Sequence, residues 1–205
     1  DPAGDPRPRG LLTAPRLGQD GPVTIPRLGD LDPRTALDQP ELLADPVAAA
    51  LSDWAHRGRV GVVSIDPGLA DTAALTEAYR LPLTASANCV VVAGRRGGQE
   101  RLAACVARAD TRADVNSLVK RLLDVRKASF LPVERAVEES GMEYGGITPL
   151  GLPSDWRVLV DRRAVEIETA VLGSGLRRSK LLLPGYLLGE LPRAEVVDDL
   201  GLPVG

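Results

Sequence analysis

The chain has few of the residues on which nucleophilic and metal-dependent catalysis usually depend. Its 205 residues include one histidine, His56, and two cysteines, Cys89 and Cys105. One histidine cannot build a histidine-rich metal site, and a serine or cysteine triad would have to use that single imidazole. Because His56 follows an alanine-rich helical stretch and precedes Gly58, we interpret it as part of a helix end. We therefore expect no metal, no cofactor and no histidine-based catalysis.

Long apolar runs and lysines are also scarce. No apolar run approaches the roughly 18 residues that a membrane span needs. The first residues are rich in proline and arginine, unlike a signal peptide. We expect a soluble, cytoplasmic protein without a membrane partner. The net charge of -3 argues against tight, sequence-independent wrapping of nucleic acid. Only three of the 25 basic residues are lysines, and this abundance of arginine alone says little about function.

Two cysteines are too few for a disulfide framework and lack the spacing of metal ligands. The segments "NCVVVAG" and "ERLAACVARA" flank "RRGGQ", a pattern that predicts a β-hairpin. A symmetric loop would pair Gly94 with Glu100 and place Cys89 opposite Cys105. Two buried thiols are the favoured interpretation, and a redox switch is the alternative. Strand alternation puts Asn88 on the face opposite Cys89.

The composition, with 44% hydrophobic and 26% charged residues, suits one compact domain. Residues 1–40 are punctuated by proline, glycine and aspartate without lasting periodicity, so we expect a loosely ordered N-terminal arm. Residues 41–205 would form the domain. Helices are predicted from Asp45, from about Asp71, over Asp110–Leu123 and from Pro132 to Gly141, with a last short one in "PGYLLGEL".

Strands are predicted over Arg59–Ile65 and in "WRVLVD", "ETAVLG" and "SKLLLP". Strands and helices interleave irregularly, without the strict alternation of a doubly wound sheet. The sequence therefore predicts an α+β fold, with a mixed β-sheet or a partly open barrel surrounded by helices.

The segment "GMEYGGITPLGLP", from Gly141 to Pro153, is too rich in glycine for a helix or a long strand. The pair Gly145-Gly146 lets backbone N–H groups point into a pocket without obstruction, and Pro149 biases Thr148 toward extended geometry. Such a loop can hold an anion or a developing oxyanion. A plain structural loop is the alternative, because the segment matches neither a Walker loop nor a Rossmann turn.

The blocks around this segment resemble the YbaK/EbsC family, the family of the editing domain associated with prolyl-tRNA synthetase. The resemblance runs over roughly residues 60 to 200. It rests on "DTAALTEAYRLPLTASANCVVVAG", "TRADVNSLVKRLLDVRKASF", the glycine-rich segment, "VLVD", "VLGSG" and "LLLPG". It implies a mixed sheet with surrounding helices, and a pocket that hydrolyses misacylated aminoacyl-tRNA, chiefly of the proline type.

The resemblance also implies site residues. The glycine-rich loop would contact the aminoacyl ester and the terminal adenosine, and the turn at 173–175 would close the other side of the pocket. Asp161 stands at a position that is often acidic in relatives. The implied substrate-binding residues are Ile147, Thr148, Pro149, Asp161, Gly173, Ser174 and Gly175, and the implied oxyanion donors are Gly145 and Gly146.

One departure from the family concerns Asn88. Active members carry a lysine at the start of the first hairpin strand, in a pattern like "KTLVF", and this chain has "ANCVV" there. An ammonium can stabilise charge on an ester carbonyl, whereas asparagine donates only a neutral hydrogen bond. Losing such a contact commonly costs ~3 kcal/mol, or about two orders of magnitude in rate.

Three functional hypotheses follow. The first is an aminoacyl-tRNA deacylase in which water attacks the ester, Asn88 positions the substrate, and Val90 and Ile147 limit the size of the side chain. Its partners would be the acceptor end of a tRNA and a synthetase. The second is a non-catalytic module that binds aminoacyl-tRNA or a nucleotide-like ligand, which the loss of the lysine motivates. The third is a different hydrolase that uses the same pocket.

Overall fold

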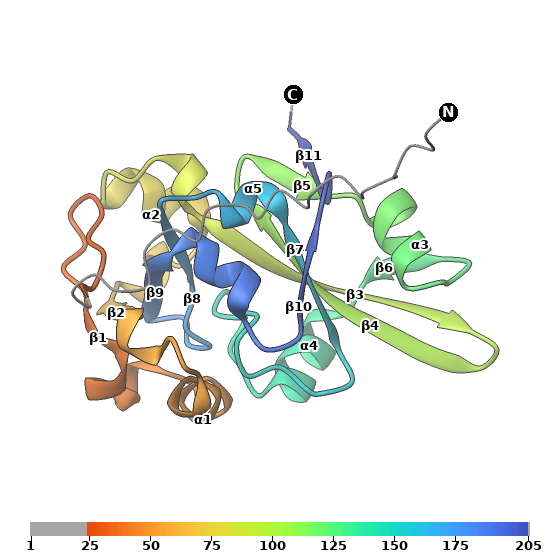
Figure 1. Ribbon diagram of the computed structural model, residues 1–205, viewed down its shortest axis with the longest axis horizontal. Coiled ribbons are helices and arrows are strands. Elements are labelled where there is room, and N and C mark those ends of the chain that lie inside the picture. The colour runs from red at the N-terminus through yellow and green to blue at the C-terminus, as the bar shows by residue number, and fades with distance from the viewer. Residues whose placement is uncertain (1–23, 205) are drawn as a thin grey trace, which may run out of the picture.

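The computed structural model describes residues 24–204, and Figure 1 shows its elements. The strands are β1 (Arg34–Thr35), β2 (Gly61–Ser64), β3 (Ala87–Arg96), β4 (Gln99–Arg108), β5 (Thr111–Ala113), β6 (Ala128–Phe130), β7 (Arg157–Asp161), β8 (Thr169–Gly173), β9 (Ser179–Pro184), β10 (Ala194–Val197) and β11 (Gly201–Pro203). The α-helices are α1 (Asp45–Asp53), α2 (Thr72–Ala78), α3 (Lys120–Leu122), α4 (Val133–Ser140) and α5 (Arg162–Val165). A π-helical turn, η6 (Val115–Val119), precedes α3. The 3-10 turns are η1 (Ala36–Asp38), η2 (Pro40–Leu42), η3 (Arg57–Arg59), η4 (Pro67–Leu69), η5 (Leu83–Ala85) and η7 (Gly185–Glu190).

The strands form two large sheets and one small one. The first has the order β1-β2-β9-β8, the second β10-β7-β4-β3-β6, and β11 pairs with β5. The pairs β4–β7 and β7–β10 are parallel, and the other pairs are antiparallel. The predicted α+β class with mixed sheets is thus confirmed, and the described part of the chain contains no closed barrel. In Figure 1 the first sheet lies on the left and the long β3–β4 hairpin extends to the right.

The hairpin is confirmed, but its predicted register is wrong by one residue. Arg96 pairs with Gln99, so the loop is the two-residue turn Gly97-Gly98, in which both glycines have positive φ, 58° and 82°. A two-residue turn with both φ positive matches the right-handed twist of the flanking strands.

This register separates the two thiols. Cys89 pairs with Val106, and Cys105 pairs with Val90, so strand alternation directs the cysteines to opposite faces of the sheet. Burial raises the pKa of Cys105 to about 12 and raises that of Cys89 further above its usual value. Both thiols are therefore poor nucleophiles, and they form no redox pair.

The helix predicted over Asp110–Leu123 is wrong in its first part. Residues Thr111–Ala113 form β5 and pair with β11, which lies at the far end of the chain. The helical part begins only after Asp114, whose carboxylate accepts hydrogen bonds of 3.1 Å from the amides of Ser117 and Leu118. The apolar residues do have helical spacing, but the first residues of the segment pair with a remote strand instead of forming a helical turn.

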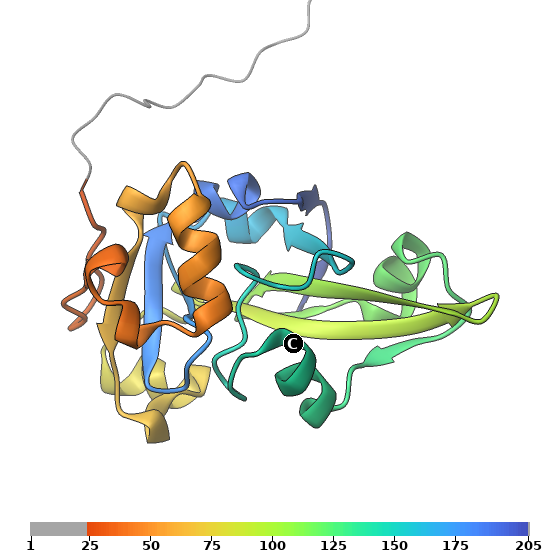
Figure 2. The same ribbon diagram turned by 90° about the horizontal axis from the view of Figure 1, so that it is seen from below.

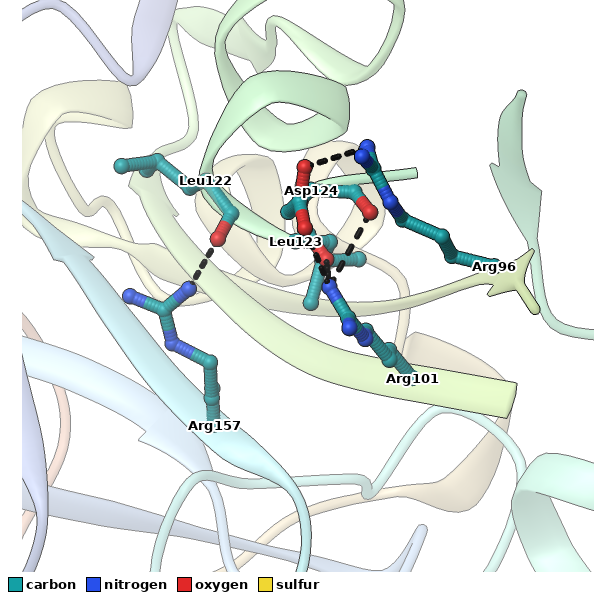
Figure 3. Close-up of polar contacts among 6 residues, drawn as sticks. All are labelled: Arg96, Arg101, Leu122, Leu123, Asp124 and Arg157. Carbon is teal, nitrogen blue, oxygen red and sulfur yellow. Dashed lines mark hydrogen bonds and ion pairs between the residues drawn. The ribbon is translucent and has the colours of Figure 1, made fainter. Parts of the chain in front are cut away.

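The end of α3 is held against the second sheet by arginines from three strand positions, as Figure 3 shows. Arg96 donates to the Asp124 carboxylate at 2.6 Å, and Arg101 donates to the same side chain at 3.0 Å. Arg157 of β7 donates to the carbonyl oxygen of Leu122. These contacts satisfy helix C-terminal carbonyls and fix a turn in which Asp124 has positive φ, 52°.

The main core lies between the sheets and α1. Strand β9 is buried on both faces: Leu181 and Leu183 pack in this core, and Leu182 packs in a second cluster with Leu75 of α2. Figure 2 shows α1 lying across the first sheet. Of the predicted arm, residues 1–23 lie outside the described residues. From residue 24 the chain packs on the domain, where β1 pairs with β2 and Ala36 is fully buried.

Candidate functional site

A pocket of about 400 Å³ lies where the two large sheets meet. Ser86, just before β3, forms a parallel β-bridge with Val171 of β8, and both residues line the pocket. The start of α2, the loop after α4 and the start of β9 supply the remaining polar wall. Residues of β6 and α4 supply apolar side chains. Segments from most of the chain therefore contribute to one site.

Four of the predicted site residues come together here: Asn88, Gly145, Ile147 and Gly173 all line the pocket, as does Val90. Six others do not line it. These are Gly146, Thr148, Pro149, Asp161, Ser174 and Gly175. The structure thus separates a group that faces the cavity from a group that stands behind its walls or away from it.

The glycines allow two backbone segments to approach closely. A Cβ on Gly146 would lie 2.7 Å from the backbone of Leu176, and a Cβ on Gly173 would lie 2.3 Å from the carbonyl oxygen of Gly146. Gly175 donates its amide to Gly146 O, and Glu143 donates its amide to Gly175 O, both at 2.8 Å. The glycine-rich loop is therefore fastened to the β8–β9 connection, and of the turn at 173–175 only Gly173 lines the pocket.

The backbone amides of this loop are not equally free. Gly146 donates its amide to the carbonyl oxygen of Glu143 at 2.9 Å, so that N–H is already used. The amides of Gly145, whose φ is +79°, and of Ile147 have no acceptor among residues 24–204. Since both residues line the pocket, they are the amides on which an oxyanion site could be built.

Several of the predicted residues that do not line the pocket are buried behind its walls. The hydroxyl groups of Ser174 and Ser179 lie 2.7 Å apart in the interior. Thr148 is fully buried, and its hydroxyl oxygen has no partner in the described part of the chain. Pro149 follows it into the core. These residues position the loop rather than line the cavity.

Asp161 ends β7 away from the pocket. Its carboxylate accepts the amide of Arg163 at 2.8 Å, which caps α5, and the amide of Gly201 at 2.5 Å, which fixes the start of β11. Both oxygens are thus occupied by backbone donors inside the protein, and the side chain is fully buried. This geometry gives Asp161 a role in the fold.

Asn88 lies at the mouth of the pocket and is exposed. Its Oδ1 accepts a hydrogen bond of 2.8 Å from the hydroxyl of Thr72, the first residue of α2. Its Nδ2 has no partner within the described chain, so this amide group remains available as a donor.

The sequence analysis missed the one cation among the pocket-lining residues, Lys180 of β9. It lies opposite Gly173 in the sheet and is 7% exposed. Its Nζ donates to Ala70 O at 2.8 Å and to Gly145 O at 3.4 Å. Burial lowers its pKa from 10.5 to about 8, an effect that Asp71 opposes and Arg177 reinforces. The signal in the sequence was a lysine inside the otherwise apolar strand "SKLLLP".

A second buried polar group lies in the pocket. Ser86 is 3% exposed, and its hydroxyl oxygen has no hydrogen-bond partner among residues 24–204. A buried hydroxyl without a partner costs free energy unless a bound molecule or water satisfies it. The pocket therefore offers an ammonium and a hydroxyl inside mainly apolar walls.

Two exposed aromatic rings border the pocket. Phe130 at the end of β6 is 61% exposed, and Tyr144 in the glycine-rich loop is 59% exposed. The guanidinium of Arg177 lies 5.7 Å from the centre of the Tyr144 ring, and 3.7 Å separates it from the Asp71 carboxylate. Exposed rings beside a cation suit the faces and phosphates of unpaired nucleotides.

Neither His56 nor a cluster of potential metal ligands lies at this pocket in the described part of the chain. The only histidine, His56, packs edge-on against Trp54, with 5.4 Å between ring centres, and does not line the pocket. Residues 24–204 contain no cluster of three potential metal ligands. They also contain no helix long and apolar enough to cross a membrane.

The fold and pocket define an α+β domain with a small cavity between two sheets, in which mainly apolar walls surround a few polar groups. The family model of the aminoacyl-tRNA editing domain matches residues 66–188, more than half of the chain. The chain belongs to this family, which confirms the resemblance seen in the sequence. Every residue that lines the pocket lies within the matched range.

Solved structures of low sequence identity share this fold. A candidate trans-editing enzyme for prolyl-tRNA synthetase has a TM-score of 0.64 and 20% identity, with 79% of this chain and 97% of that chain covered. A hypothetical protein has a TM-score of 0.61 and 20% identity, with 69% and 90% covered. A scaffold from computational epitope grafting has a TM-score of 0.66 and 18% identity, with 79% and 97% covered. No curated protein matches the sequence at the significance required.

Proposed function

We propose that this protein is an aminoacyl-tRNA deacylase, which hydrolyses the ester between an amino acid and the terminal ribose of a tRNA. The observation that carries the proposal is the pocket itself, whose lining lies entirely within the family match. Its volume of about 400 Å³ suits an aminoacyl group on a nucleoside rather than a folded macromolecule.

The loop amides and Asn88 have different roles in the proposed reaction. Gly145 and Ile147 donate hydrogen bonds to the carbonyl oxygen as negative charge develops on it. The free Nδ2 of Asn88 donates to the substrate at the mouth and positions the ester. The ribose hydroxyl next to the ester relays the proton, which suits a pocket without a histidine. The apolar residues Val90 and Ile147 limit the size of the amino-acid side chain, by ~1–3 kcal/mol for each methylene group.

The exposed rings extend the site beyond the ester. Phe130 and Tyr144 stack on the unpaired bases at the 3′ end of the tRNA, and Arg177 contacts a phosphate. A proline isoacceptor carrying alanine, serine or cysteine is the proposed substrate, in the cytoplasm and beside a synthetase that releases the mischarged product. The similarity in fold to a candidate trans-editing enzyme supports this choice.

A non-catalytic binding module is the second candidate function. Asn88 favours it, because the family's lysine is missing at that position. The same pocket would then hold an aminoacyl-tRNA end without cleaving the ester.

Hydrolysis of alanyl-, seryl- and cysteinyl-tRNA of the proline isoacceptor separates the two functions. The purified protein should accelerate ester loss well above buffer with at least one of them. A matched variant, Ile147→Trp, should fill the cavity and abolish that acceleration, whereas Leu83→Trp at an exposed position outside the pocket should not. Binding without acceleration would support the module and refute the deacylase.

A further inference from the structure

Lys180 lines the pocket, but its positive charge has no role in the mechanism proposed so far. The two residues after it, Leu181 and Leu182, are fully buried, and the lysine itself is only 7% exposed. Burying an ammonium among apolar side chains is costly, and an apolar residue would serve the strand better. A strand that keeps a lysine here therefore bears a cost that the fold alone does not explain.

The contacts of Lys180 leave it incompletely satisfied. An ammonium has three N–H donors, and the structure provides two acceptors, Ala70 O at 2.8 Å and Gly145 O at 3.4 Å. No carboxylate among residues 24–204 forms an ion pair with it. The charged groups that act on it are Asp71 from the start of α2 and Arg177 from the β8–β9 connection, and their effects oppose each other. One N–H donor of the ammonium is therefore left for a molecule in the pocket.

We propose that Lys180 supplies, from β9, the cation that the family resemblance places at position 88. Its third N–H contacts the carbonyl oxygen of the bound aminoacyl ester, beside the amide of Gly145. This assignment rests on the proposed deacylase function. Asn88 and Lys180 line the same pocket from different sheets. A lysine at either position could therefore place its ammonium group in the same cavity.

The reaction step balances without consuming the lysine. The water oxygen bonds to the carbonyl carbon, and the π electrons move onto the carbonyl oxygen, where Lys180 and the loop amide stabilise the charge. Collapse of this intermediate breaks the bond between the carbonyl carbon and the ribose oxygen. The proton lost by the water ends on that ribose oxygen, and a free amino acid leaves.

The test compares Lys180→Met with Lys127→Met, a matched change at an exposed lysine outside the pocket. Both variants are first checked for folding by thermal unfolding. Under single-turnover conditions, Lys180→Met should hydrolyse the best of the three mischarged tRNAs about 100-fold more slowly, and Lys127→Met should match the wild type. A loss of less than threefold in folded Lys180→Met would overturn the proposal.

A rescue experiment tests whether the two positions are equivalent. Adding Asn88→Lys to Lys180→Met should raise the hydrolysis rate at least tenfold above that of Lys180→Met alone. The new lysine would return a positive charge to the pocket from the other wall. Absence of any gain in a folded double variant would contradict the assignment of Lys180 as a replacement for the family's lysine.

A binding experiment keeps this inference separate from the deacylase proposal. If the wild type hydrolyses none of the three substrates, the deacylase function fails, and the probe becomes 3′-(L-alanylamino)-3′-deoxyadenosine, an amide analogue of the tRNA end. Calorimetry should then show at least tenfold weaker binding to Lys180→Met than to the wild type. Equal affinity would show that Lys180 does not contact the aminoacyl group.

Discussion

The carbonyl oxygen of Gly146 accepts the amide hydrogen of Gly175 at 2.8 Å, and this bond joins the glycine-rich loop to the β8–β9 connection. Gly173 and Lys180, which pair in the sheet, stand on either side of that connection. The loop that provides free amides and the strand that provides the cation are therefore parts of one rigid wall.

The close approach at Gly146 predicts a strong effect of Gly146→Ala. The added Cβ would lie 2.7 Å from backbone atoms of Leu176, which cannot move as a side chain can. We expect a loss of about 1–3 kcal/mol in the free energy of unfolding, and lower activity in the protein that remains folded. Gly189→Ala, whose Cβ would meet only side-chain atoms, the nearest at 3.2 Å, is the control for chemical denaturation. Equal stability of both variants would contradict this role for Gly146.

The unpartnered hydroxyl of Ser86 gives a different pattern. Ser86→Ala removes a buried group without a partner, so the free energy of unfolding should stay the same or rise. If the hydroxyl contacts the aminoacyl group, kcat/KM should fall about tenfold. Ser179→Ala is the contrasting control, because its hydroxyl bonds Leu42 O at 2.7 Å and its loss should cost about 1 kcal/mol of stability. Unchanged kcat/KM in Ser86→Ala would exclude the contact.

The aromatic rim should act on tRNA binding. Phe130→Ala removes an exposed ring and should leave the melting temperature nearly unchanged. Stacking of a base is worth roughly 1–3 kcal/mol, so KM for the charged tRNA should rise about 5- to 160-fold. Leu83→Ala, an exposed apolar residue away from the pocket, should change neither quantity. A similar KM for both variants would show that Phe130 does not stack on the nucleic acid.

Asp161 is a test of structure against substrate binding. Asp161→Asn weakens two hydrogen bonds to backbone amides and should lower the free energy of unfolding by about 2 kcal/mol. At a temperature where the variant is folded, kcat should be close to that of the wild type. A large loss of kcat with normal stability, measured by calorimetry and single-turnover kinetics, would instead place the carboxylate at the substrate.

Because Lys180 is buried, we expect stability and activity to change in opposite directions as the pH rises. Its pKa is about 8 in the folded protein against a usual 10.5. Near neutral pH the lysine is protonated in both the folded and the unfolded chain, so the burial penalty is fully present. Between pH 8 and 10.5 the folded protein loses the proton first, and the free energy of unfolding gains on the order of 3 kcal/mol from this group.

Activity should fall over the same range, after the buffer rate is subtracted, because the uncharged amine stabilises the oxyanion less. Lys180→Met should lack this pH-dependent gain in stability, which denaturant unfolding at several pH values measures. The chain has only three lysines, so selective ¹³C labelling gives few signals from which to read the titration directly. A midpoint near the usual lysine value would contradict the buried environment.

The sequence predicted most of this fold because its local signals agree with the tertiary structure. Proline at the start of a helix and glycine after it placed α4 correctly, and Gly141 takes the left-handed conformation with φ of 67°. The errors occurred where distant segments meet. The pairing of β5 with β11 replaced the first turn of a predicted helix. The short helix predicted in "PGYLLGEL" is present as the 3-10 helix η7. The sequences of β10 and β11 show no strong alternation of apolar and polar residues, so they did not indicate strands.

The site was predicted less completely than the fold. Of the residues that the resemblance implied, Asn88, Gly145, Ile147 and Gly173 line the pocket, but the resemblance could not distinguish residues that line a cavity from those that support it. It also directed attention to the missing lysine at position 88. Lys180 went unnoticed because a strand buried on both faces has no polar side from which its inward charge could be inferred.

The initial rate of alanyl-, seryl- and cysteinyl-tRNA hydrolysis by the wild-type protein, measured with and without 3′-(L-alanylamino)-3′-deoxyadenosine, tests the central claim most directly. We expect at least one substrate to be hydrolysed about 100-fold faster than in buffer, and the analogue to inhibit competitively by occupying the pocket. Rates equal to buffer for all three substrates, or hydrolysis that the analogue does not inhibit at saturation, would contradict it.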